Sequence, residues 1–91
     1  MSVVVTIDVP GGTEQQYDAI AAKVFPDGKV PEGWLLHLSG PSETGWRVVN
    51  VVPSQAEFEK FAQDQLIPAA EAAGDPPAQM TFSAVHNLVR P

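Results

Sequence analysis

Residues 34–52 read WLLHLSGPSETGWRVVNVV, and this stretch decides the fold. Its two ends, residues 34–39 and 46–52, are rich in Leu, Val and Trp and have the length of β-strands. Residues 40–45 between them contain Gly, Pro, Ser and Thr, a composition typical of a turn. The stretch therefore predicts a β-hairpin with a longer connecting loop.

Further strands are predicted on both sides of the hairpin. Residues 2–9 are rich in Val and Ile, and Pro10-Gly11-Gly12 ends the run. Residues 80–89 form the last strand pattern. With a helix on each side of the hairpin, residues 1–91 predict a single α+β domain. It has the ferredoxin-like βαββαβ order and a four-stranded antiparallel sheet.

The two helices are recognised by their first residues. Thr13 and Ser54 are typical N-cap residues, and Gln16 and Glu57 follow three positions later, as in a capping box. Apolar residues then recur at helical spacing. Pro68 lies inside the second helix and predicts a kink or a restart there, because proline has no N–H to donate.

The strands carry apolar residues on both faces, which indicates a dimer. In the first strand Val3 and Val5 face one side and Val4 the other, and Val48 and Val49 repeat this in the third strand. Two helices can cover only one face of the sheet, so the second face needs another cover. A homodimer in which two sheets face each other is the favoured interpretation. The alternative is a monomer with an exposed apolar patch.

Composition narrows the classes of partner. The chain has 91 residues, a formal net charge of −6, five scattered Lys and Arg residues and no Cys. This charge disfavours nucleic acid and anionic membrane surfaces. The absence of Cys excludes disulfides, and residues 3–5 are too short an apolar run for a signal peptide or a membrane span. We therefore expect a cytoplasmic protein. No glycine-rich nucleotide motif is present, and we expect no cofactor.

The chain resembles the small dimeric α+β barrel proteins grouped with antibiotic biosynthesis monooxygenases. The resemblance rests on residues 36–41 (LHLSGP), 45–51 (GWRVVNV) and 85–88 (VHNL), and on Ser54 with Glu57 and Phe58. It implies a dimeric α+β barrel. The superfamily includes cofactor-independent oxygenases, isomerases and haem enzymes. Relatives often have an acidic residue, Trp and Glu where this chain has Asn50, Val52 and Pro53.

Three residues are candidates for catalysis. His37 lies in a predicted strand and is the type of side chain that suits a proton shuttle near neutral pH. Asp8 could orient its imidazole or act as a base, and Asn50 could donate to a substrate. Each residue also has a purely structural interpretation. His37 would be a strand histidine that hydrogen-bonds to protein groups, Asp8 a solvated strand end, and Asn50 a buried amide in a hydrogen-bond network. Whether His37 and Asn50 share a face depends on the hairpin register.

Three further residues are candidates for substrate binding. Tyr17 lies on the apolar stripe of the first helix, Trp34 begins the second predicted strand, and His86 lies in the last one. Each could equally belong to the core or to an ordinary strand. Two histidines without a third ligand do not predict a metal site.

Three functional hypotheses follow. In the first, the protein is a cofactor-independent monooxygenase or an isomerase/cyclase of secondary metabolism. It acts on a flat, aromatic or polyketide-like molecule, and His37 shuttles a proton. One ring nitrogen of His37 is held by a protein group, and the other faces the ligand. In the second, it is a non-catalytic dimer that binds a small ligand or a partner, which Asn50 and the absent Trp favour. A haem or metal protein ranks third.

Overall fold

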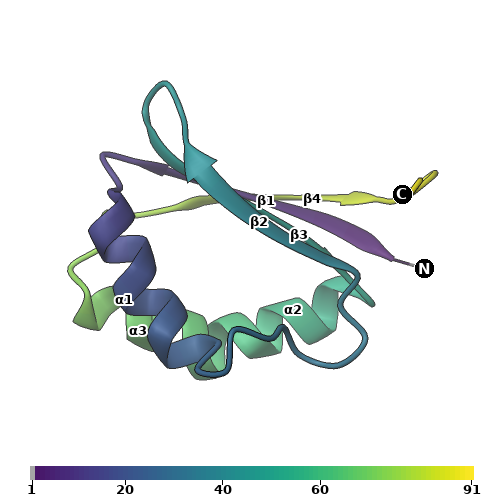
Figure 1. The fold of residues 1–91 in the computed structure, drawn as a ribbon, viewed down its shortest axis with the longest axis horizontal. Coiled ribbons are helices and arrows are strands. Elements are labelled where there is room, and N and C mark those ends of the chain that lie inside the picture. The colour runs from purple at the N-terminus through teal and green to yellow at the C-terminus, as the bar shows by residue number, and fades with distance from the viewer. Residues whose placement is uncertain (1) are drawn as a thin grey trace.

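The computed structural model describes residues 2–91 and has the predicted α+β architecture. The four strands form one antiparallel sheet in the order β2-β3-β1-β4. All the helices lie on one side of this sheet (Figure 1). In chain order the elements are β1 (Val3–Pro10), α1 (Glu14–Val24), β2 (Leu36–Pro41), β3 (Gly45–Val52), α2 (Gln55–Phe61), a π-helical segment (Ala62–Leu66), α3 (Ile67–Ala72) and β4 (Gln79–Ala84).

Helix α1 begins at the predicted capping box. The Thr13 hydroxyl accepts from the Gln16 N–H at 3.2 Å, and the Gln16 side chain accepts from the Thr13 N–H at 3.1 Å. The helix buries Ile20 and Val24 against the sheet. These two bonds satisfy donors that the first helical turn would otherwise leave unpaired, so the sequence sets the start of α1 locally.

The second helical stretch changes its winding just before Pro68. Ser54 caps α2 by accepting from the Glu57 N–H. The following segment is π-helical, and the Ile67 N–H bonds to the Ala62 carbonyl. Pro68 cannot donate to the preceding turn, and α3 resumes around it. The backbone stays helical from Gln55 to Ala72, so the chain does not break at Pro68, and the helix changes its winding in the π-helical segment just before it.

The core lies between the sheet and the helices. Val5, Val52 and Phe58 are the largest fully buried side chains. In β1 the core residues alternate with partly exposed ones, as the period of a half-covered strand requires. No helix within residues 2–91 is long and apolar enough to cross a membrane.

The other sheet face is apolar over β2, β3 and β1. Leu36 and Leu38 are 37% and 49% exposed there, and by register Val4 and Val49 share their face. Toward β4 this face becomes polar, since Thr81 pairs with Thr6. Apolar residues on both faces, as the sequence predicts, are thus present in the structure.

Two predicted strand boundaries are wrong. β2 begins at Leu36, so Trp34 precedes the strand. β4 ends at Ala84, and His86 lies in an exposed bend beyond it. Strand ends depend on where the neighbouring strand stops offering backbone partners, and β1 begins at Val3, opposite Ala84.

Candidate functional site

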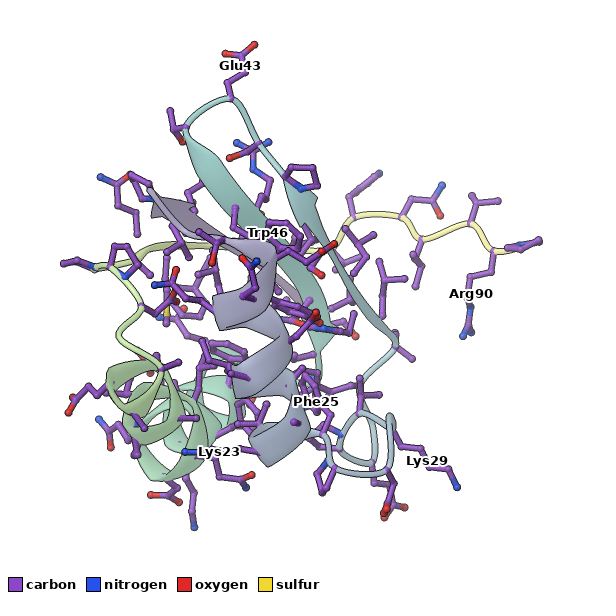
Figure 2. All side chains as sticks on the ribbon, turned by 60° about the vertical axis from the view of Figure 1, so that its left-hand side comes forward. Lys23, Phe25, Lys29, Glu43, Trp46 and Arg90 are labelled. Carbon is purple, nitrogen blue, oxygen red and sulfur yellow. The ribbon has the colours of Figure 1, made fainter. Side chains whose placement is uncertain are left out.

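A cavity of about 300 Å³ lies between the helix-covered face of the sheet and the helices. Its walls are mostly apolar and include six aromatic side chains: Tyr17, Phe25, Trp34, Trp46, Phe58 and Phe61. Figure 2 labels Trp46 near the N-terminal end of α1 and Phe25 near its C-terminal end, so aromatic rings border the cavity along that helix. The size and composition are those of a small-molecule site.

Three polar residues form a hydrogen-bonded chain in this cavity. His37 on β2 is the direct cross-strand partner of Asn50 on β3, so both side chains lie on the helix-covered face. His37 Nδ1 is 2.6 Å from Asn50 Oδ1, and His37 Nε2 is 2.6 Å from the Tyr17 hydroxyl on α1. The register thus settles a question that the sequence left open.

The chemistry of the amide sets the direction of these bonds. Asn50 Oδ1 can only accept, so His37 Nδ1 carries a proton and donates to it. The neutral imidazole then has its lone pair on Nε2, which accepts from the Tyr17 hydroxyl. Asn50 therefore fixes the tautomer of His37, and His37 makes Tyr17 a polarised hydroxyl at the cavity wall.

Both ring nitrogens of His37 are engaged by protein groups. The sequence-based hypothesis of a catalytic His37 expected one nitrogen to be left for a ligand, and this detail is wrong. A proton could still leave or reach the imidazole through the Tyr17 hydroxyl, which also lines the cavity. Tyr17 is therefore the group of the chain that is placed to contact a ligand directly.

One buried side-chain donor at this cavity has no partner. It is Trp46 Nε1, the buried side-chain nitrogen without a hydrogen bond among residues 2–91, and Trp46 lines the cavity. A buried donor without a partner is unfavourable in a protein interior. In this cavity the Trp46 N–H is a ready donor for a ligand oxygen. Asn50, which is only 3% exposed, uses its Oδ1 to accept from His37.

Aromatic packing holds the chain in place. The Tyr17 ring stacks on His37 with centroids 6.0 Å apart, and it packs against Trp46 at 5.7 Å. Phe25 meets His37 edge-on at 4.8 Å. These contacts restrict the rotamers of Tyr17 and His37, so that the hydroxyl stays aimed at Nε2.

The other candidate residues are placed differently. Trp34 lines the cavity and packs on Phe58 and Phe61. Asp8 does not line the cavity: it lies on the other face of β1, where its carboxylate accepts from Arg47 Nε at 2.7 Å. Because β-strand side chains alternate between faces, Asp8 lies on the face opposite His37 and is not brought together with it.

His86 does not belong to the site either. It is exposed beyond the end of β4, outside the cavity lining. The structure therefore does not bring His86 together with His37, Tyr17 and Trp34. Within residues 2–91, no group of three or more His, Asp or Glu side chains is placed to hold a metal ion.

Sequence reasoning missed several cavity residues. Phe25 follows Ala21 by four positions and so continues the apolar stripe of α1, a signal that was present. Glu71 and Asp75 also line the cavity, although they are distant from the hairpin in sequence. Burial raises the pKa of the Asp75 carboxyl above its usual value. No sequence pattern indicates these two, because Glu71 on α3 and Asp75 in the loop after it reach the cavity only through tertiary packing.

The fold is similar to that of a known oxygenase. No protein-family model and no curated protein matches the chain. Among solved structures, a mutant of SnoaB, a cofactor-independent oxygenase from Streptomyces nogalater, superposes with a TM-score of 0.61. The match covers 97% of this chain and 94% of SnoaB at 15% sequence identity. The ferredoxin-like α+β fold expected for the single chain is thereby confirmed.

Proposed function

We propose that this protein is a small-molecule enzyme that transfers a proton to and from a flat, apolar ligand without a cofactor. The observation that carries the proposal is the Tyr17–His37–Asn50 chain, which ends on a mostly apolar cavity of about 300 Å³. The similarity to a cofactor-independent oxygenase supports the same class of chemistry. The substrate class is an aromatic or polyketide-like ketone or phenol of secondary metabolism.

The chain can act as a relayed base. An acidic proton of the ligand passes to the Tyr17 oxygen while the Tyr17 proton passes to His37 Nε2. The resulting imidazolium keeps its Nδ1–H bond to Asn50 Oδ1. Negative charge that develops on the ligand oxygen is stabilised by the N–H of Trp46, whose Nε1 is buried without a partner among residues 2–91 and whose ring packs against Tyr17.

The ligand enolate has two productive fates. Return of the proton to another ligand atom completes an isomerisation or favours a cyclisation. In an oxygenation, O₂ is the co-reactant: the ligand carbon forms a bond to O₂, the peroxide takes the proton, and loss of water leaves a new carbonyl. Both routes need the same base and oxyanion donor, so the geometry supports them equally.

The proposal includes a homodimer and a cytoplasmic location. Leu36 and Leu38 are exposed on the uncovered sheet face. The same apolar face of a second copy would bury them in a dimer interface. A cysteine-free chain has no need of an oxidising compartment.

The alternative is a dimeric protein that binds a ligand without reaction. It is favoured by one observation, that both ring nitrogens of His37 already have protein partners. Under this alternative the Tyr17–His37–Asn50 chain is a structural network, and the cavity only binds.

Anthrone, a flat tricyclic ketone with an acidic CH₂ group, separates the two functions. We expect the protein to accelerate deuterium exchange of that CH₂, or its oxidation to anthraquinone in air. We expect Tyr17→Phe to lose about 10²- to 10⁴-fold of the rate, the usual contribution of a positioned acid–base group. Glu59→Gln, an exposed change outside the cavity, is the control. Binding of anthrone by calorimetry without exchange or oxidation would establish the non-catalytic alternative.

A further inference from the structure

We infer that the cavity selects a flat ligand whose edge carries a hydrogen-bond donor beside an acceptor, as the N–H and C=O of a lactam do. The ligand donor bonds to the Tyr17 oxygen, and the ligand acceptor bonds to the Trp46 N–H. This inference rests on the small-molecule site proposed above and names the class of its ligand through the direction of the hydrogen bonds.

The Tyr17–His37–Asn50 chain has one direction, and Asn50 sets it. Asn50 Oδ1 lies 2.6 Å from His37 Nδ1 and can only accept, so the imidazole proton is on Nδ1. Nε2 of the neutral ring then has a lone pair and no proton. The Tyr17 hydroxyl, 2.6 Å from Nε2, therefore donates to it. The single proton of this hydroxyl is thus used inside the protein.

Tyr17 consequently presents a lone pair, and no proton, to a ligand. A hydroxyl group has one donor and two acceptor positions. Among residues 2–91, the bond to His37 is the one hydrogen bond of this hydroxyl. Tyr17 lines the cavity, and its ring packs against those of His37 and Trp46. A ligand N–H or O–H at this oxygen makes a hydrogen bond, whereas a ligand carbonyl there meets a second acceptor.

Trp46 presents the opposite kind of group. Its indole Nε1 can only donate, and it is buried without a partner among residues 2–91. Figure 2 shows Trp46 beside α1, the helix that carries Tyr17, and the two ring centroids are 5.7 Å apart. A buried donor without a partner is unfavourable, and a ligand acceptor would satisfy it. Two rings in contact thus supply one acceptor and one donor to the same cavity.

A lactam matches this pair of groups. Its N–H and C=O lie side by side on one edge of a flat ring and do not bond to each other, so both are free for the protein. The rest of the cavity lining is mostly apolar and aromatic, which suits the flat body of such a ligand. The same orientation puts the acidic proton of the ligand on the Tyr17 oxygen, where the proposed proton relay begins.

Two isomers of one quinolone test the inference by calorimetry at about pH 8, where a histidine side chain is ordinarily neutral. 3-Methyl-2-quinolone keeps the N–H beside the C=O, and 1-methyl-2-quinolone has its methyl group in place of that proton. We expect the N–H isomer to bind about three- to tenfold tighter, the usual contribution of one hydrogen bond. Tyr17→Phe should bring this ratio to about one, and the exposed change Glu59→Gln should keep it.

Nuclear magnetic resonance tests the two ends of the arrangement separately. The nitrogen-15 shifts of the His37 ring should show its proton on Nδ1. The indole N–H signal of Trp46, assigned by its loss in Trp46→Phe, should move downfield when either isomer binds, because both keep the C=O. Trp46→Phe should weaken both isomers and leave their ratio above one.

Each outcome has a distinct meaning. Equal binding of the two isomers, tighter binding of 1-methyl-2-quinolone, or a His37 proton on Nε2 overturns the inference and leaves the small-molecule site in place. A preference that survives in Tyr17→Phe, once circular dichroism has shown this variant to be folded, also overturns it. Failure of both isomers to bind to the folded wild type overturns the small-molecule site itself.

Discussion

His37 is held between two partners of opposite hydrogen-bonding character. Asn50 Oδ1 can only accept, and the Tyr17 hydroxyl completes the chain toward the cavity. This arrangement resembles the logic of a catalytic triad, in which a third residue fixes the tautomer of a histidine and the histidine activates a hydroxyl. The hydroxyl here belongs to an aromatic ring that is itself packed between His37 and Trp46.

Removing Asn50 should destabilise the protein through His37. In Asn50→Leu, the His37 Nδ1–H would lose its acceptor in a part-buried site, which costs about 1 kcal/mol. We expect the urea midpoint of unfolding to fall accordingly. Ser39→Ala, on the same strand as His37, is the control and should change it little. An unchanged midpoint for Asn50→Leu would show that the hydrogen bond does not form in solution.

Asp75 should make stability depend on pH in a defined direction. Its folded pKa is raised from the ordinary value of 3.8 by burial, so the folded state binds the proton more tightly than the unfolded chain. Its contribution therefore favours folding at low pH and is lost as pH rises above 3.8 through the folded pKa. We expect Asp75→Asn to be more stable than the wild type at pH 7.

The measurement is chemical unfolding of the wild type and Asp75→Asn at several pH values. The stability difference should shrink as the pH falls toward and below 3.8. A constant difference across the whole range would mean that the carboxyl of Asp75 is not desolvated.

At the scale of elements, each helix start is set by a short local signal. Ser54 accepts from the Glu57 N–H and so pairs one of the free donors of α2. In a complete capping box the Glu57 side chain would also accept from the Ser54 N–H, but the cap of α2 contains only the Ser54 bond. The cap of α1 contains both bonds of the box.

Loss of the Ser54 cap should lower stability by a modest amount. We expect Ser54→Ala to reduce the free energy of unfolding by about 1 kcal/mol, since alanine cannot accept the Glu57 N–H. Thr44→Ala in the hairpin loop, where the side chain is exposed, is the matched control. Equal unfolding midpoints for the two variants would contradict the capping role.

At the scale of the whole molecule, helices cover one face of the sheet, and no element among residues 2–91 covers the other. Leu36 and Leu38 are exposed on that second face. For a chain of 91 residues, which buries only about two-thirds of its unfolded surface, the apolar area of a second copy is a substantial gain.

We therefore predict a dimer that a single charge disrupts. The wild type should sediment at about twice 9.7 kDa at micromolar concentration. Leu38→Lys should yield the 9.7 kDa species, because an unpaired charge in a buried interface is strongly unfavourable. The lysine should leave each folded subunit intact, since Leu38 is 49% exposed in the single chain. Gln63→Glu, exposed on the helical side, is the control, and a monomeric wild type would overturn the dimer.

The sequence by itself determined the order of the elements, the helix starts at Thr13 and Ser54, and the change of winding before Pro68. These features follow from backbone donors, N-cap oxygens and the missing N–H of proline, which act within a few residues. It also showed that both sheet faces are apolar, because strand side chains alternate with a period of two.

Only the tertiary structure decided the site. His37 and Asn50 share a face because β2 and β3 pair in one register, and a slip by one residue would separate them. The same alternation put Asp8 on the opposite face beside Arg47, and the early end of β4 left His86 outside. Asp75 reaches the cavity because a loop tied to α1 brings it there. Register, strand ends and loop placement depend on partners far away in the chain, so local sequence could name the candidates but could not bring them together.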